Sequence, residues 1–237
     1  MKQLLLLASV ATSLIVGVNS ARADAAVYEG FDYTSGSDIT TLPGTGTGFT
    51  GGWFSSTGGI LGFTDSTGLD FGSLATSGGS LDVTSGGGNS WFFLSRSLGT
   101  TIANTDTLYE SFLFQYNGAG AMGSGDNFGI SAGDTSGNDH TMGILPRNYN
   151  GATTGRVTFS DGVRTDMTYT NGGVTDGNTY LFIGKWTNLG GASTATGWAL
   201  SLSNFNAISG SPITEADLNA NNVATATVNG TAGSFGT

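Results

Sequence analysis

The chain has 237 residues, of which 41 are glycine, 10 % are charged and none is cysteine. The glycines follow no Gly-X-Y period, which excludes collagen, and 14 Phe, 7 Tyr and 4 Trp are enough apolar bulk for a core, which argues against simple disorder. The formal net charge of −10 argues against nucleic acid and anionic lipid as partners, because both need a basic surface. The length suits one large all-β domain.

Residues 1–23 are typical of a signal peptide that forms a short helix. Lys2 gives a positive start, an apolar run covers 4–18, and Ala21 and Ala23 fit the small-x-small rule for cleavage. The run is shorter than the roughly 20 residues of a membrane span, although an uncleaved anchor is the alternative. Cleavage would remove two of the seven basic residues and none of the 17 acidic ones, leaving a net charge of −12. The sequence therefore predicts an exported protein, secreted, periplasmic or on the cell surface.

The mature chain, 24–237, is expected to form a single domain of short strands joined by glycine-rich turns. Val27 to Tyr33 alternates like an opening strand, and 44–59 is expected to be an ordered loop held by its aromatic residues. The one predicted helix covers 212–219, with Thr214 as its cap. This spacing of strands and turns favours an antiparallel sandwich or jelly roll of about 12 to 13 strands. The other expected strands are 71–74, 80–84, 89–98, 107–116, 126–132, 140–145, 155–160, 166–170, 178–187 and 197–205.

Two segments near the start carry a family resemblance. YEGFDY at 28–33 followed by TGFTGGW at 47–53 resembles the opening of exported bacterial LamG-like, concanavalin A-like jelly-roll proteins, many of which bear a PEP-CTERM sorting tail. YESFLFQY at 109–116 and NTYLFIGKWT at 178–187 are similar to two inner strands of that family, so the resemblance spans about 27–205. It implies a jelly roll in a surface or extracellular-matrix protein, with glycan binding as an analogy of fold.

The end of the chain departs from that family, whose members close with a further strand and a sorting tail. We interpret the sequence as truncated after Thr237, with a tailless variant as the alternative. Truncation would leave the expected strand 27–33 with an unpaired edge. Membrane contact would then be limited to the signal peptide or to the missing C-terminal anchor.

Two glycine motifs resemble catalytic or nucleotide sites, but their contexts do not fit. G-x-S-x-G at 129–133 places Ser131 before a polar turn rather than a helix, although the single histidine, His140, could face it across a hairpin. G-x-G-x-x-G at 118–123 precedes a strand, whereas a dinucleotide site needs a helix there. With 41 glycines such matches arise by chance, so no catalytic residue is assigned.

A secreted glycoside hydrolase or lyase on the same fold is the alternative function. Such enzymes use a pair of carboxylates, and their E-x-D-x-x-E pattern is absent here. Glu110 lies alone in an apolar strand, and we expect it to be partly exposed or paired with Arg96. The sequence therefore favours a protein without enzymatic activity.

Calcium is the one cofactor that the turns favour. It needs several oxygen ligands brought together by a tight turn, and the loops 65–70 and 134–139 have that composition. Asp134 and Asp139 are the candidate ligands. The alternative is that these residues only form turns, because Asp, Asn and Ser side chains bond to the nearby backbone.

Glycan binding would use an exposed aromatic ring beside polar side chains. Trp91, Trp186 and Trp198 fall within strand segments and are expected in the core. Tyr149 is expected in a polar loop beside Arg147 and Asn148, and these three residues are the candidate contacts for an extracellular polysaccharide. A purely structural matrix component without a small ligand is the remaining hypothesis.

Overall fold

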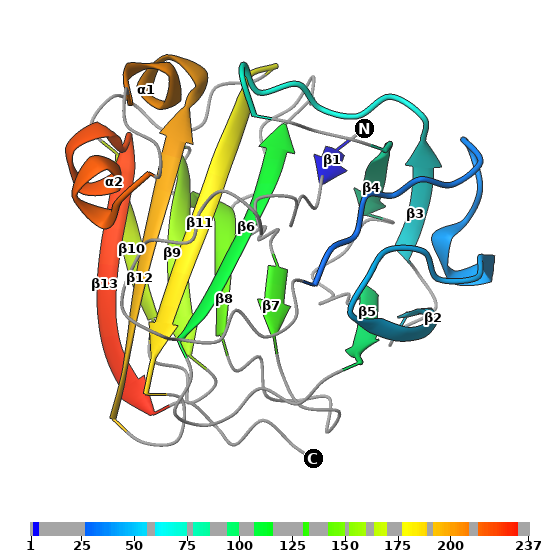
Figure 1. Ribbon diagram of the computed structural model, residues 1–237, viewed down its shortest axis with the longest axis horizontal. Helices are drawn as coiled ribbons and strands as arrows, with labels where there is room; N and C mark the ends of the chain where they lie inside the picture. The colour runs from blue at the N-terminus through cyan, green and yellow to red at the C-terminus, as the bar shows by residue number, and fades with distance from the viewer. Residues whose placement is uncertain are drawn as a thin grey trace.

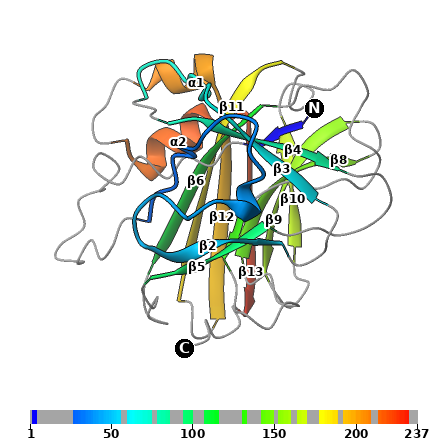
Figure 2. The same cartoon turned by 90° about the vertical axis from the view of Figure 1, so that its right-hand side faces the viewer.

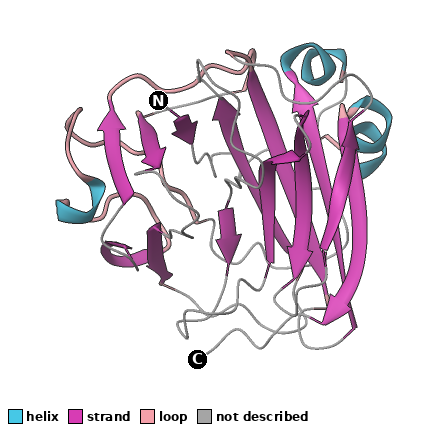
Figure 3. Ribbon diagram, turned by 180° about the vertical axis from the view of Figure 1, so that it is seen from behind, coloured by secondary structure: helices cyan, strands magenta, loops and turns pink. Residues whose placement is uncertain are grey.

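The computed structural model is dominated by antiparallel β-strands, with three short helices (Figure 3). The all-β fold class is therefore confirmed. The residues that the structure describes are 2–4, 27–55, 60–74, 78–85, 94–99, 107–115, 130–132, 142–149, 152–159, 164–169, 177–188, 192–208 and 213–231.

Eleven of the thirteen described strands form one sheet, and the other two pair as a separate ribbon (Figure 1). All of the pairings are antiparallel. The ribbon consists of β2 (Phe49–Ser55) and β5 (Leu94–Leu98). The order in the large sheet is β3 (Ile60–Asp65), β4 (Ser80–Ser85), β1 (Lys2–Leu4), β6 (Leu108–Gln115), β11 (Thr179–Thr187), β12 (Ala192–Ser201), β13 (Ala224–Thr231), β10 (Arg164–Tyr169), β9 (Ala152–Phe159), β8 (Met142–Tyr149) and β7 (Ile130–Ala132).

The large sheet folds back on itself beyond β13. Strand β9 contacts β12 and β13, and β8 contacts β11, although none of these pairs is adjacent in the sheet order. Figure 1 shows β8, β9 and β10 behind β11, β12 and β13. We call the side of β6, β11, β12 and β13 that is turned toward β8 and β9 the inner face, and the opposite side the outer face.

The inner face is packed with aromatic and small side chains. Phe112 stacks on Phe182 with ring centroids 5.3 Å apart, and Phe114 meets Phe182 edge to face at 6.2 Å. Trp186 and Ala195, which are cross-strand partners, are fully buried. Small residues on β12 and β13 let the second layer approach closely, so the core sits between the layers.

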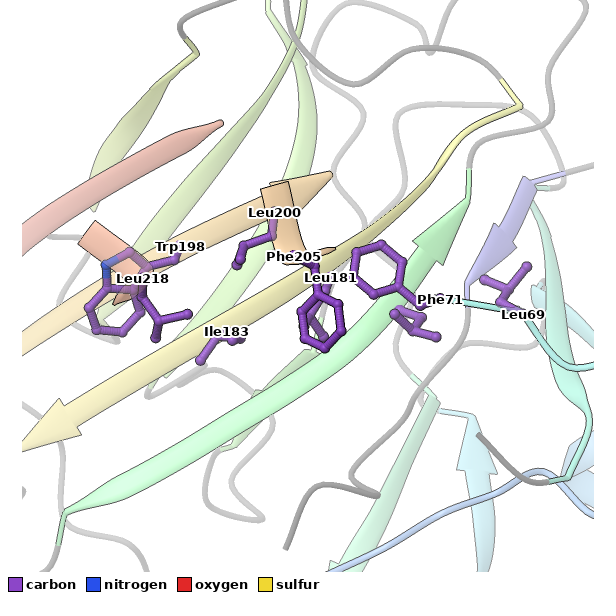
Figure 4. Packing of buried hydrophobic residues seen from close by; sticks show 9 residues of the cluster. Leu69, Phe71, Leu181, Ile183, Trp198, Leu200, Phe205 and Leu218 are labelled. Atoms are coloured by element: carbon purple, nitrogen blue, oxygen red, sulfur yellow. The ribbon is translucent and has the colours of Figure 1, made fainter. Parts of the chain in front are cut away.

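Toward one end the outer face is covered by α1 (Leu202–Ala207) and α2 (Glu215–Asn221), together with Leu69 and Phe71. Phe205 of α1 and Leu218 of α2 are buried there against Leu181 and Trp198 of the sheet (Figure 4). Trp198 also donates a hydrogen bond from Nε1 to Asn219 Oδ1 at 2.7 Å. The buried cluster beneath the helices consists of Leu69, Phe71, Leu113, Leu181, Ile183, Trp198, Leu200, Phe205 and Leu218.

Both helices begin at a side-chain cap. Thr214 accepts from the Asp217 amide and Asp217 bonds back to Thr214, which is a complete capping box, so the predicted helix and its cap are confirmed. Helix α1 occupies a segment that was predicted to be the last part of the strand 197–205. Ser201 ends that strand because its side chain accepts the Asn204 amide and caps the helix instead.

The N-terminal part differs most from the sequence predictions. Where a signal-peptide helix was predicted, Lys2–Leu4 is strand β1, which pairs with both β4 and β6. Residues 27–33 form no strand and make one bridge, Tyr28 to Thr47, because Phe31 adopts a left-handed φ of 52°. The expected unpaired sheet edge at 27–33 is therefore also wrong.

The glycine-rich segment was predicted as a loop, but Phe49–Ser55 within it is strand β2. Its expected fixation by aromatic residues is confirmed, since Trp53 stacks on Phe31 with ring centroids 5.8 Å apart. Figure 2 shows the ribbon of β2 and β5 beside β3 and β4, the part of the molecule away from α1 and α2. The segment 71–74 is a turn rather than a strand, and the 3₁₀ helix η1 (Ile39–Thr41) was not predicted.

Candidate functional site

The N-terminal segment is held to β5 by a buried ion pair. Arg96 Nη1 lies 2.5 Å from Glu29 Oε2, and the two side chains are 4 % and 0 % exposed. Glu29 also accepts from the Phe31 amide at 2.8 Å and from the Tyr33 hydroxyl at 3.1 Å. The pairing of Arg96 with Glu110 suggested by the sequence is wrong, because the chain folds Glu29 onto Arg96 instead.

The remaining contacts of Arg96 show that this cluster is structural. The guanidinium donates to the carbonyls of Thr45 and Gly51 and lies 4.7 Å from the centroid of the Phe49 ring. The close approach of the chain beside this cluster requires a glycine at position 46, because Gly46 has a φ of 81° and a side chain there would overlap the Tyr28 carbonyl. The charged groups of Glu29 and Arg96 thus both bond to other groups of the protein. The cluster therefore links segments that lie far apart in the sequence.

Glu110 has a buried carboxyl oxygen in different surroundings, although the residue as a whole is half-buried, which agrees with the partly exposed alternative from the sequence. It lies on the inner face of β6, opposite Gly184, and its Oε1 atom is buried with no hydrogen-bond partner among the described residues. Burial raises the pKa of Glu110 from 4.5 to about 8. At neutral pH the carboxyl group is therefore protonated.

A glycosidase would need a second carboxylate near Glu110. In the sequences of β6, β11, β12 and β13, Glu110 is the one acidic residue. The pairing of Gln3 with both Asp82 and Gln115 places Asp82 on the opposite face of the sheet from Glu110. Strands β6, β11, β12, β13 and β4 thus place no second carboxylate on the inner face beside Glu110.

The outer face carries a polar group of a different kind next to α2. Lys185 pairs with Glu215, whose Oε1 also accepts the Tyr109 hydroxyl at 3.0 Å, and the Lys185 ammonium lies 5.9 Å from the Tyr109 ring centroid. The hydrogen bond from Lys185 lowers the pKa of Glu215. Burial acts to lower the pKa of Lys185, but the contacts with Glu215 and Tyr109 outweigh it and raise that pKa. Both groups are charged at neutral pH and neutralise each other.

Beyond this pair, the outer face continues as an open polar surface. Tyr109 is 43 % exposed. Thr227 and Asn229 are also exposed, while Lys185, Thr194 and Thr196 are half-buried. Tyr109, Lys185, Thr196 and Thr227 lie opposite one another on four adjacent strands. Thr194 and Asn229 lie opposite each other on β12 and β13, two positions away from Thr196 and Thr227. We call this set the polar face: Tyr109, Lys185, Thr196 and Thr227 in the first row, with Thr194 and Asn229 in the second.

A small hollow lies at the end of the sheet beside α1. Its volume is about 270 Å³, and its wall carries polar groups from β11 and from the start of α1. Asp70, Asn178, Ser201 and Ser203 are among the residues that line it. It provides hydroxyl, amide and carboxylate groups, but it holds no exposed aromatic ring.

The predicted sugar contacts lie elsewhere, and their expected loop is wrong. Arg147, Asn148 and Tyr149 are the last residues of strand β8, paired with Thr154, Thr153 and Ala152 of β9, because both strands extend further toward this hairpin than the expected 140–145 and 155–160. The structure describes only the backbone there, so their contact with a ligand stays a prediction. None of these three residues belongs to the polar face. The polar face was not predicted from the sequence.

The predicted metal and cleavage residues fall outside the described part of the chain. This applies to Asp134, Asp139, Ala21, Ala23 and the motif at 118–123. In the other candidate calcium loop, Asp65 Oδ1 accepts the Thr67 amide at 2.8 Å, as a turn-forming aspartate does. The described residues contain no group of three or more side chains that could hold a metal ion.

The G-x-S-x-G motif does not form a nucleophile elbow. Ser131 is the middle residue of strand β7 and lies directly across from Gly143 of β8. A nucleophilic serine instead needs a sharp turn between a strand and a helix. His140 lies outside the described residues.

Trp186 and Trp198 are 0 % and 1 % exposed, which confirms their predicted place in the core, whereas Trp91 lies outside the described residues. Of the helices that the structure describes, none is both long and apolar enough to cross a membrane. Comparison of the chain with protein-family models, curated proteins and solved structures finds no match in any of the three.

Proposed function

We propose that this chain is an exported, non-catalytic surface or extracellular-matrix protein that binds glycans through the polar face. Export is inferred from residues 1–23, and the LamG-like jelly roll from the segments quoted above. The antiparallel strands in two facing layers are compatible with that architecture. Extracellular polysaccharide is the proposed partner.

The observation that carries the proposal is the exposed ring of Tyr109 beside fixed polar groups. Glu215 holds the Tyr109 hydroxyl, and Lys185 lies over one side of the ring. An exposed aromatic ring offers an apolar face for the C–H groups of a sugar, while its neighbours offer hydrogen bonds to the hydroxyl groups. The neighbouring threonines continue this polar surface over β12 and β13.

The test is the replacement Tyr109→Ala, followed by affinity electrophoresis in gels that contain soluble polysaccharide. We expect the wild-type protein to be retarded by at least one polysaccharide and the variant to lose about tenfold in affinity. Phe54→Ala is the matched control, because Phe54 is an aromatic residue of β2 that is 62 % exposed away from the polar face. Equal retardation of wild type and Tyr109→Ala would refute the polar face as the binding surface.

A secreted glycoside hydrolase or lyase is the second candidate, and one observation favours it. Glu110 keeps its proton at neutral pH, as a general acid must. Hydrolysis or eliminative cleavage of a polysaccharide by the wild-type protein, lost in Glu110→Gln, would establish this candidate. We expect no such turnover, because β6 and its neighbours β11, β12 and β13 carry no second carboxylate beside Glu110.

A further inference from the structure

We propose that the polar face binds a neutral, extended glycan whose chain runs across the strands, from Tyr109 on β6 to Thr227 on β13. This inference rests on the proposed function and specifies its ligand class. It follows from three features of the polar face: its length, the fixation of its hydroxyl groups and its charge.

The first row has the dimensions of a short oligosaccharide. Tyr109 pairs with Lys185, Lys185 with Thr196, and Thr196 with Thr227, so the row crosses four adjacent strands. At about 4.8 Å between strands, it spans roughly 14 Å. A single sugar would cover only part of that distance, whereas an extended chain of several sugars would meet every residue of the row.

The hydroxyl groups of the row are held in place before any ligand arrives. Thr196 and Thr227 share a hydrogen bond between their hydroxyl oxygens at 3.1 Å, and Thr194 donates to Asn229 Oδ1 at 2.9 Å in the second row. Threonine is also restricted at χ1 by its branched Cβ. Binding a sugar chain here would therefore immobilise little additional side-chain freedom.

The charge of the surface favours a neutral ligand. Lys185 is the one basic residue in the sequences of β6, β11, β12 and β13, and Glu215 neutralises it. The chain as a whole has a net charge of −10, which repels uronate or sulfated polysaccharides. Threonine hydroxyls and an asparagine amide can donate to and accept from the hydroxyl groups of an uncharged sugar.

The test compares a neutral series, mixed-linkage β-glucan, galactomannan and xylan, with alginate and polygalacturonate in affinity gels. For each polymer that binds, its oligosaccharides are then titrated in order of length. We expect retardation by at least one neutral polymer and none by the acidic ones, with affinity rising up to about the tetrasaccharide. Thr227→Val should weaken binding about fivefold. Thr67→Val should leave it unchanged, because Thr67 is an exposed threonine that follows β3, which lies at one end of the sheet order and is not part of the polar face.

Retardation by acidic polymers that is lost in Tyr109→Ala would overturn the neutral ligand class while leaving the proposed function intact. Monosaccharide binding as tight as that of the longer chains would overturn the extended mode. Retardation by none of these polymers would overturn this inference. Glu215→Gln gives a further check, because freeing the Lys185 charge should create binding to alginate that the wild-type protein lacks; no gain would contradict the role assigned to that pair.

Discussion

Alternate residues of the same strands lie in two different environments, on the inner face and on the outer face of the sheet. Along β13, Ala224, Ala226 and Val228 are buried on the inner face, while Thr225, Thr227 and Asn229 alternate with them and are exposed. The inner side chains determine the packing of the two layers. The exposed ones are not needed for that packing, so they are free to carry a binding function.

The outer face is itself divided. Toward the helices, Trp198 and Leu200 are buried beneath α1 and α2, whereas two residues earlier Thr196 is half-buried and bonded to Thr227. The position of α2 marks this division, because Leu218 packs into the apolar part and Glu215 reaches Lys185 in the polar part. One short helix thus covers the apolar residues and borders the proposed binding surface.

The largest effect is expected from Phe182→Ala on the inner face. Phe182 is fully buried and contacts the rings of Phe112 and Phe114, so its removal leaves a cavity. We expect a loss of about 3–5 kcal/mol in the free energy of unfolding, measured by urea denaturation. A loss below about 1 kcal/mol would mean that the inner face is not the core.

The next effect depends on pH and comes from Glu110→Gln. The pKa of Glu110 is raised to about 8 by burial, so the folded state holds a proton that the unfolded state releases above about pH 4.5. The contribution of Glu110 to wild-type stability should therefore be fully present below about pH 4.5 and should be lost as the pH rises toward 8.

The Glu110→Gln variant has no titratable carboxyl group at this position. Its free energy of unfolding should therefore lose that part of the pH dependence. Urea denaturation of both proteins at pH 5 and pH 9 measures the difference. We expect Glu110→Gln to be more stable than wild type at pH 9 and close to it at pH 5. Parallel stability curves between these two values would show that Glu110 is not held in a desolvated environment.

A smaller loss is expected from Trp198→Phe on the covered part of the outer face. The change keeps an aromatic ring but removes the hydrogen bond from Trp198 Nε1 to Asn219 Oδ1. It should cost about 1–2 kcal/mol, because Asn219 loses its partner and some volume is lost. Asn219→Ala in the Trp198→Phe background should then add little, and full additivity would argue against the contact.

The smallest effect on stability is expected from Thr227→Val on the polar face. Thr227 is exposed and has a β-branched shape that valine preserves, so the free energy of unfolding should change by less than about 0.5 kcal/mol. Circular dichroism during thermal unfolding measures this change. A large loss would mean that the polar face serves folding and not binding.

The sequence predicted the strands that carry strong apolar patterns. The inner strands β6 and β11 were expected within one residue of their observed bounds, because Phe112, Phe114 and Phe182 mark them clearly. By contrast, β13 was not predicted, since its inner residues include Ala224 and Ala226, which give little hydrophobic contrast with threonine. The alternation of alanine and threonine was the available signal.

The features missed in the N-terminal segment and on the polar face depend on long-range contacts. Glu29 and Phe31 alternate like strand residues, and only the fold brings Arg96, 67 residues later, onto Glu29. Glu215 likewise meets Tyr109, which lies 106 residues earlier in the chain. The spacing of residues along the sequence carries no information on such pairs. The sites predicted from the sequence are therefore all local motifs.

The most direct test of the central claim is to map a bound glycan by NMR on the methyl groups of β13. Thr225 and Thr227 report on the outer face, and Ala226 and Val228 report on the inner face. With a neutral oligosaccharide at saturation, we expect the methyl signal of Thr227 to shift while those of Ala226 and Val228 stay in place. Shifts confined to the inner-face methyl groups, or to residues outside the polar face, would contradict the assignment of this surface.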